Sequence, residues 1–116
     1  MEISLEGPPS TNAWADVSLL EGCDGAATVA ATDNSGVSTG FTGDLITGAP
    51  AAVLRSKHDG SVAIAKTVGE GASDAARDYE LSLLDPTKNA SIVDQYKPAI
   101  KTENGRFVVT MYRGSF

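Results

Sequence analysis

Two Asp-Gly dipeptides directly follow the only cysteine and the only histidine of the chain. Cys23 precedes Asp24-Gly25 in "GCDGAATVAAT", and His58 precedes Asp59-Gly60 in "KHDGSVAIAKT". If the two turns lay against each other, the thiol and the imidazole would form the minimal pair for thiolate nucleophilic catalysis. No oxyanion-hole motif and no third orienting residue accompany them, so a turn that is used twice is the simpler interpretation.

The other residue types that could hold a ligand do not occur in a functional pattern. One cysteine and one histidine cannot complete a closed zinc site without carboxylates from elsewhere. The segment Asp33–Gly36 lacks the spacing and the distal glutamate of a calcium loop. The glycines of "GVSTGFTG" are not followed by the Gly-Lys-Ser/Thr of a phosphate-binding loop. We therefore expect no enzyme, no catalytic residues, no metal or other cofactor, and no small-molecule substrate.

Length and composition indicate one domain with a modest core, since the chain has 116 residues. No stretch reaches the roughly 18 apolar residues of a membrane span, and "MEISLEGPPS" does not have the pattern of a signal peptide. A lone cysteine cannot form an internal disulfide, which suits a reducing compartment. We expect a protein without membrane partners.

The charge is distributed unevenly along the chain. Residues 1–54 contain seven acidic and no basic residues, whereas residues 55–116 contain nine basic and eight acidic ones, and the net charge is −6. The strong basic excess that usually marks a nucleic-acid-binding protein is missing. A local basic surface could still form from the second half of the chain.

Alternating apolar residues between turn residues predict a mostly β fold with little helix. Hairpins are expected at Asp24-Gly25 and at Asp59-Gly60, because Asp-Gly readily adopts the positive φ angles of a type I′ turn. With the later strands they predict an antiparallel meander sheet of about six to seven strands in a single domain, residues 1–116. Residues 1–13 would form an N-terminal arm and residues 14–113 the sheet.

Two later segments each admit two interpretations. Arg77–Leu84 alternates apolar and polar residues before an Asp-Pro, which favours a strand. A helix from Ser73 to Leu84, with Ser73 as its N-cap, is the alternative. Residues 98–113 predict either one long strand or a hairpin that turns at Asn104-Gly105.

The order of these segments resembles the coat proteins of single-stranded RNA bacteriophages, the levivirus-like family, over about residues 14–113. The resemblance lies in "VSLLEGCDGAATVAAT", "DNSGVSTG", "SVAIAKTVGEGASDAARDYELSLLDP" and "AIKTENGRFVVTMYR". The third stretch looks like the family's central pair of long strands, and the fourth looks like its last long strand. The family normally ends in two helices that clasp a dimer partner, whereas this chain stops at "RGSF", where they should begin.

The resemblance implies a virion protein that is made in the bacterial cytoplasm, pairs with copies of itself, and builds an icosahedral capsid around viral RNA. Without the two helices, one apolar face of the sheet would stay uncovered and would serve as the assembly interface. We expect that face to comprise Val62, Ile64, Leu81, Leu83, Phe107, Val109 and Met111.

The resemblance also implies that the inner face of the shell contacts RNA. The strands that would read an RNA hairpin are poor in positive charge here, so nonspecific phosphate contacts are the expected mode. The candidate residues are Arg55, Lys57, Lys66, Lys101 and Arg106.

Two other classes of protein fit the same sequence. A decoration or tail-associated protein of a double-stranded DNA phage would share the acidic surface and the Gly/Ala/Thr-rich strands, and it would bind a preformed capsid. A β-sandwich binding module would instead carry its specificity in the turn loops near Asp24, Asp44 and Asp59.

Overall fold

The computed structural model describes residues 1–93 and 98–113, and the expectation of a mostly β fold with antiparallel strands is confirmed. A single α-helix is present in these residues. The elements are β1 (Glu2–Leu5), β2 (Ala13–Asp16), β3 (Ala27–Ala31), β4 (Ser38–Gly40), the 3-10 turn η1 (Ala51–Val53), β5 (Leu54–Ser56), β6 (Val62–Ile64), α1 (Asp74–Leu83), β7 (Ile100–Thr102) and β8 (Phe107–Met111).

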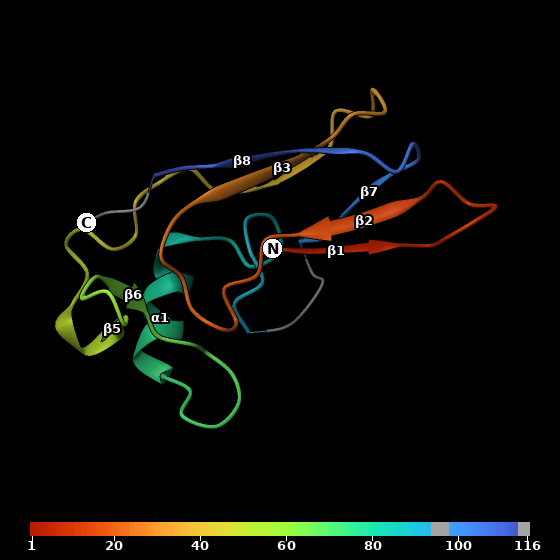
Figure 1. Ribbon diagram of the computed structural model, residues 1–116. Coiled ribbons are helices and arrows are strands. Elements are labelled where there is room, and N and C mark those ends of the chain that lie inside the picture. Colours follow the sequence, from red (N-terminus) through yellow and green to blue (C-terminus); the bar gives the residue numbers. More distant parts are fainter. Residues whose placement is uncertain (94–97, 114–116) are drawn as a thin grey trace.

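The strands form three small sheets rather than one meander. Their orders are β1-β2-β7, β4-β3-β8 and β5-β6, and every pairing is antiparallel. The two three-stranded sheets lie one above the other in Figure 1, with the β5–β6 hairpin and α1 to one side. The expected meander is therefore wrong in its connectivity, because strands that are neighbours in sequence, such as β2 and β3, belong to different sheets.

Small apolar side chains bring the two three-stranded sheets together. Ala13 and Ala15 of β2, and Ala27 and Val29 of β3, are all buried, and Ala15, Ala27 and Val29 belong to one apolar core. Successive side chains of a strand point to opposite faces. These alternate positions therefore define the inner face of each sheet. The core is closed at one side by residues from α1 and from the segments before η1 and after α1.

Only one of the two expected Asp-Gly hairpins exists. Asp59-Gly60 turns between β5 and β6, as expected. The segment around Asp24-Gly25 instead connects two different sheets. Cys23 forms an isolated antiparallel bridge with Ile64, through N–H···O distances of 3.1 and 2.7 Å. Gly22 permits this close approach, since its φ is +115° and a Cβ would lie 2.9 Å from the Ile64 carbonyl oxygen.

The strand interpretation of Arg77–Leu84 is wrong, and the helical alternative is confirmed. The Ser73 hydroxyl accepts a hydrogen bond from the Ala76 N–H at 3.0 Å, as an N-cap does. The buried positions of α1 are Ala76 and Glu80, which are four residues apart. Because one of the two is a carboxylic acid, the apolar residues alone do not display the helical period.

Both ends of the sheet region differ from expectation. Residues 98–113 form neither one long strand nor a hairpin, because β7 joins β2 while β8 joins β3 in the other sheet. The expected N-terminal arm includes β1, which pairs with β2 in the register Glu2 to Asp16 and Leu5 to Ala13. The chain therefore crosses between the two sheets at residues 103–106.

Glu80 is the least favourably placed charged group in the described part of the chain. Its side chain is fully buried, and neither carboxylate oxygen has a hydrogen-bond partner among the described residues. Burial raises the pKa of Glu80 to about 8, since a buried carboxylate loses its hydration without gaining a partner. The carboxyl is consequently protonated in the folded protein at pH 6 to 7.

We expect Glu80 to make the protein less stable as the pH rises from 5 to 8. A raised pKa means that the folded state holds the proton more tightly, so stability is lost between the unfolded value near 4.5 and the folded value of about 8. The loss approaches about 4–5 kcal/mol above pH 8 if the full shift is realised. Urea unfolding of Glu80→Gln should show a nearly flat profile over this range. Glu70→Gln, at an exposed site, should retain the wild-type slope.

Candidate functional site

A basic cavity lies between the β5–β6 hairpin and the docked turn, residues 21–24, whose Cys23 forms a bridge with Ile64. Its volume is about 440 Å³. Three of the five candidate RNA contacts, Arg55, Lys57 and Lys66, line it together. The remaining lining residues are Glu21, Gly22, Cys23, Asp24, Ser56, Ala63, Ile64 and Ala65. Two acidic residues face three basic ones, so the cavity carries a net positive charge.

The three cations are held in different ways. Lys57 Nζ is 2.9 Å from Asp24 Oδ2, and this hydrogen bond raises the pKa of Lys57. The Arg55 Nη1 group donates to the Ala52 and Leu54 carbonyl oxygens at 3.1 and 2.8 Å, which anchors the guanidinium beside η1. Lys66 has no ion-pair partner among the described residues, and it is half-buried. Asp24 therefore neutralises Lys57. Arg55 and Lys66 together exceed the charge of Glu21 by one, so the cavity keeps one net positive charge for an anionic ligand.

The cavity does not supply a thiolate and imidazole pair. Cys23 is 5% exposed, and burial is the main cause that raises its thiol pKa to about 11. Its Sγ donates to the Gly25 carbonyl oxygen at 3.5 Å. His58 lies in the exposed turn of the β5–β6 hairpin and does not line the cavity. At neutral pH the thiol is protonated and weakly nucleophilic.

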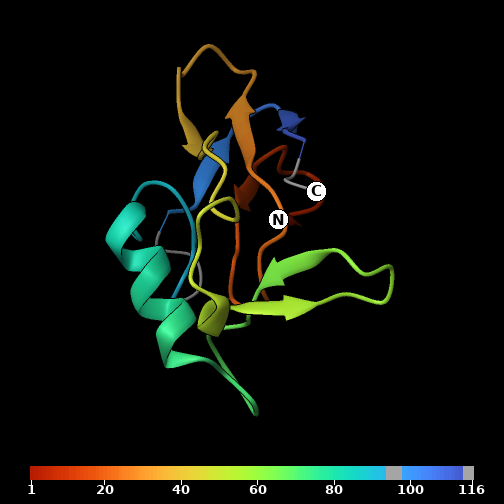
Figure 2. The same ribbon diagram turned by 90° about the vertical axis from the view of Figure 1, so that its left-hand side faces the viewer.

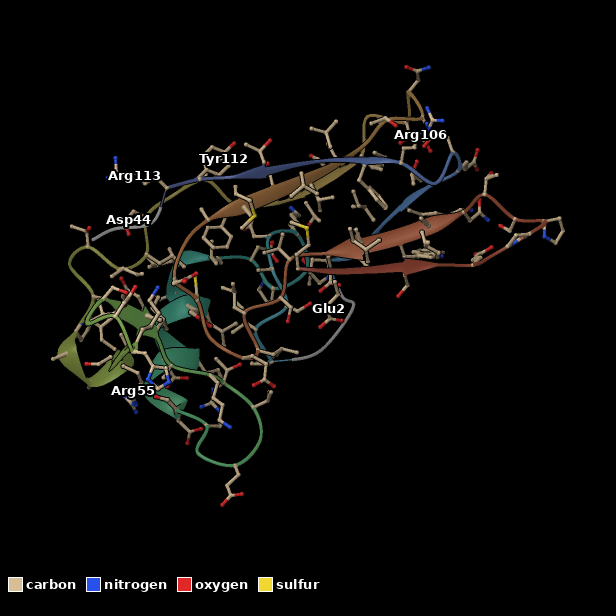
Figure 3. All side chains as sticks on the ribbon, in the orientation of Figure 1. Glu2, Asp44, Arg55, Arg106, Tyr112 and Arg113 are labelled. Atoms are coloured by element: carbon tan, nitrogen blue, oxygen red, sulfur yellow. The ribbon has the colours of Figure 1, made fainter. Side chains whose placement is uncertain are left out.

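The other two candidate RNA contacts lie away from this cavity. Lys101 on β7 is 5.9 Å from the centroid of the Trp14 ring and 4.0 Å from Glu103 Oε1. Arg106 directly precedes β8, and Figure 3 shows it at the opposite end of the molecule from Arg55. The five cations therefore do not form one surface.

The seven residues expected to form one assembly face are dispersed. Ile64 is in the core, and Val62 and Phe107 pack against that core. Leu81 and Leu83 are exposed on α1, because their segment is a helix and not a strand of the same sheet. Only Val109 and Met111 stay exposed on a strand, at 40% and 75%. The prediction of a single apolar face is therefore wrong, and of its seven residues only Val109 and Met111, both on β8, lie exposed on a strand.

An apolar segment that the sequence interpretation missed lies in β1. Ile3 and Leu5 are 52% and 72% exposed, and they pair with the buried Ala15 and Ala13 of β2. They therefore belong to the inner face of their sheet. The alternation of apolar and polar residues in "EISLE" is the sequence signal that predicts this strand, although residues 1–13 were expected to form an arm. Val109 and Met111 similarly pair with the buried Val29 and Ala27 of β3.

Residues 1–93 and 98–113 contain neither a cluster of metal-binding side chains nor a helix that could span a membrane. No group of three or more His, Cys, Asp and Glu side chains there could hold a metal ion. No helix in the same ranges has the length and apolar character to cross a membrane. Comparison of the chain with protein-family models, with curated proteins and with solved structures finds no match.

We expect Cys23 to be unreactive in the folded protein. At pH 8 a thiol with a pKa of about 11 is almost entirely protonated, and burial also blocks access to it. A chromogenic disulfide reagent should therefore label the native protein slowly and the urea-unfolded protein rapidly at the same pH. Equal rates in the two states would contradict the buried position of the thiol.

Proposed function

We propose that the protein is a virion structural subunit that assembles with copies of itself, in the manner of a phage coat protein. The observation that carries this proposal is the exposure of inner-face apolar side chains on β1 and β8. Ile3, Leu5, Val109 and Met111 face the same side as the core residues of their sheets and yet remain exposed. A second polypeptide is the natural cover for such a surface.

The size of this apolar surface suits association that is repeated many times. Complete burial of one aliphatic side chain contributes about 1.5–3 kcal/mol. The four side chains are 40–75% exposed, so about half of that contribution is available on association. The net free energy of a single contact of this kind is small, because association also costs translational and rotational freedom. A closed shell compensates, since each subunit makes several contacts at once.

The basic cavity supports contact with the RNA backbone. Arg55 and Lys66 supply positive charge that Asp24 does not neutralise. No aromatic side chain is among the lining residues, so bases have no stacking platform in this cavity. We propose nonspecific contact with phosphate groups in place of the reading of a hairpin. Assembly would take place in the bacterial cytoplasm, and the assembled protein would reside in the virion.

The purified protein should form uniform particles that contain nucleic acid. Negative-stain microscopy and the 260/280 nm absorbance ratio of the same fraction measure both properties. Regular shells with a nucleic-acid-like ratio are the expected result. Small species with a protein-only ratio under all assembly conditions would contradict the coat function. They would favour the decoration protein, which needs a preformed capsid lattice.

Removal of the positive charges of Arg55 and Lys66 should weaken RNA binding and make that binding less dependent on salt concentration. For unstructured oligouridine, the slope of log K against log salt concentration changes by about 0.7 per phosphate contact. The variant Arg55→Gln/Lys66→Gln should therefore lose about 1.4 from this slope. Arg77→Gln/Lys88→Gln, which makes the same charge change at α1 and the following turn, is the matched control. Equal losses for both variants would remove the cavity from the RNA interface.

A further inference from the structure

The sandwich of the two three-stranded sheets is open along one side, and both free edges there are apolar. β1 is hydrogen-bonded only to β2 and β8 only to β3 within the described sheets. In Figure 2, α1 lies at the left and the dark blue β8 at the right, so the helix covers the opposite side. Ile3 and Leu5 from one sheet and Val109 and Met111 from the other form the uncovered inner surface.

The two edge strands run side by side in opposite directions. Met1, before β1, and Met111, at the end of β8, line one small cavity of about 180 Å³. Leu5, at the end of β1, and Gly105, shortly before β8, line another, of about 260 Å³. The start of β1 therefore lies beside the end of β8, and the reverse holds at the other end. Figure 1 shows β8 in the upper sheet and β1 in the lower sheet.

This arrangement gives the open side a self-complementary shape. A two-fold axis parallel to the strands, midway between the sheets, would place β1 of one copy next to β8 of another. The two strands would then be antiparallel, and the same contact would form twice. The inner face of each sheet would continue into the inner face of the partner's sheet. Free strand edges readily accept such an added strand.

The charges at the strand ends favour this pairing over the pairing of two β1 strands. β1 has Glu2 at its start and is followed by Glu6, whereas β8 is preceded by Arg106 and followed shortly by Arg113. Antiparallel pairing of two β1 strands would set Glu2 against Glu6. Like charges directly opposite each other destabilise a sheet. Pairing of β1 with β8 instead sets Glu6 against Arg106 at one end of the contact.

We propose that two copies of this chain form a two-fold dimer in which β1 of each adds antiparallel to β8 of the other. The proposed register sets Met1 opposite Met111 of the partner subunit, because these two residues line one cavity within a copy. Ile3 lies opposite Val109 of the partner subunit, and Leu5 lies opposite Phe107 of the partner subunit, all on the inner faces. Glu6 lies opposite Arg106 of the partner subunit on the outer faces. The inference rests on the proposed self-assembly and names its first contact.

Cysteine cross-linking tests the pairing at two exposed outer positions. In the proposed register Ser4 lies opposite Val108 of the partner subunit, and both side chains are exposed in one copy. The single variants Ser4→Cys and Val108→Cys are made in a Cys23→Ser background and oxidised alone and as a mixture. A disulfide-linked dimer that predominates only in the mixture is the expected result. Ser38→Cys, on the exposed edge of β4, mixed with Val108→Cys is the control and should give little dimer.

The other outcomes overturn the proposal in distinguishable ways. Cross-linking of Val108→Cys alone would indicate pairing of two β8 strands, and cross-linking of Ser4→Cys alone would indicate pairing of two β1 strands. Light scattering of the Cys23→Ser protein in reducing buffer separates these results from a failure of self-assembly. Oligomers without the mixed disulfide would overturn the β1–β8 contact in this register and leave the proposed function standing. A monomer at all concentrations would overturn both.

Discussion

The structure depends on the burial of two small inner faces against each other. Each sheet has three strands of three to five residues, too few to bury an apolar surface without a second layer. Ala15 and Val29 meet in the shared core, and α1 contributes Ala76 from the closed side. Because the sheets are narrow, the cover extends over the central strands and stops before β1 and β8. The sandwich is open along β1 and β8 because, among the described residues, neither sheet has a further strand or helix to cover these edges.

The side of the core that α1 covers contains a buried acidic residue, Glu80. α1 directs Ala76 and Glu80 into the core and leaves its two leucines, Leu81 and Leu83, exposed. Protonation allows the fold to accept Glu80, since the neutral carboxyl is far less costly to bury than the charged one. The helix is held by other contacts as well, including the hydrogen bond from the Tyr79 hydroxyl to the Leu45 carbonyl oxygen at 2.7 Å. The α1 side of the core is therefore covered and contains a buried protonated carboxyl group, whereas the β1–β8 side is apolar and uncovered.

The docked turn links the sandwich to the smaller hairpin and creates the basic cavity. Two backbone hydrogen bonds between Cys23 and Ile64 fix the turn, and Lys57 reaches across to Asp24. The acidic first half of the chain and the basic second half therefore meet here, and part of the positive charge is neutralised. The basic cavity borders the open side of the sandwich, since Gly22, Cys23 and Asp24 line both this cavity and the small cavity that Met1 and Met111 line. In the proposed subunit, phosphate contact and self-association would therefore use neighbouring parts of the surface.

The sequence by itself determined the properties that are local in the chain. The mostly β character and the Asp59-Gly60 hairpin follow from alternation and turn chemistry, which involve residues close in sequence. The Ser73 cap is also a local signal, but it supported only the alternative to the strand that was expected there. Tertiary structure decided which strands pair, because alternation reveals one apolar face of a strand but not its partner. It placed β2 and β3 in different sheets, buried Glu80, and left Ile3 and Met111 exposed although their patterns match those of core residues. It also brought Arg55 and Lys66 into one cavity and kept Arg106 apart, since such distances depend on the sum of all long-range contacts.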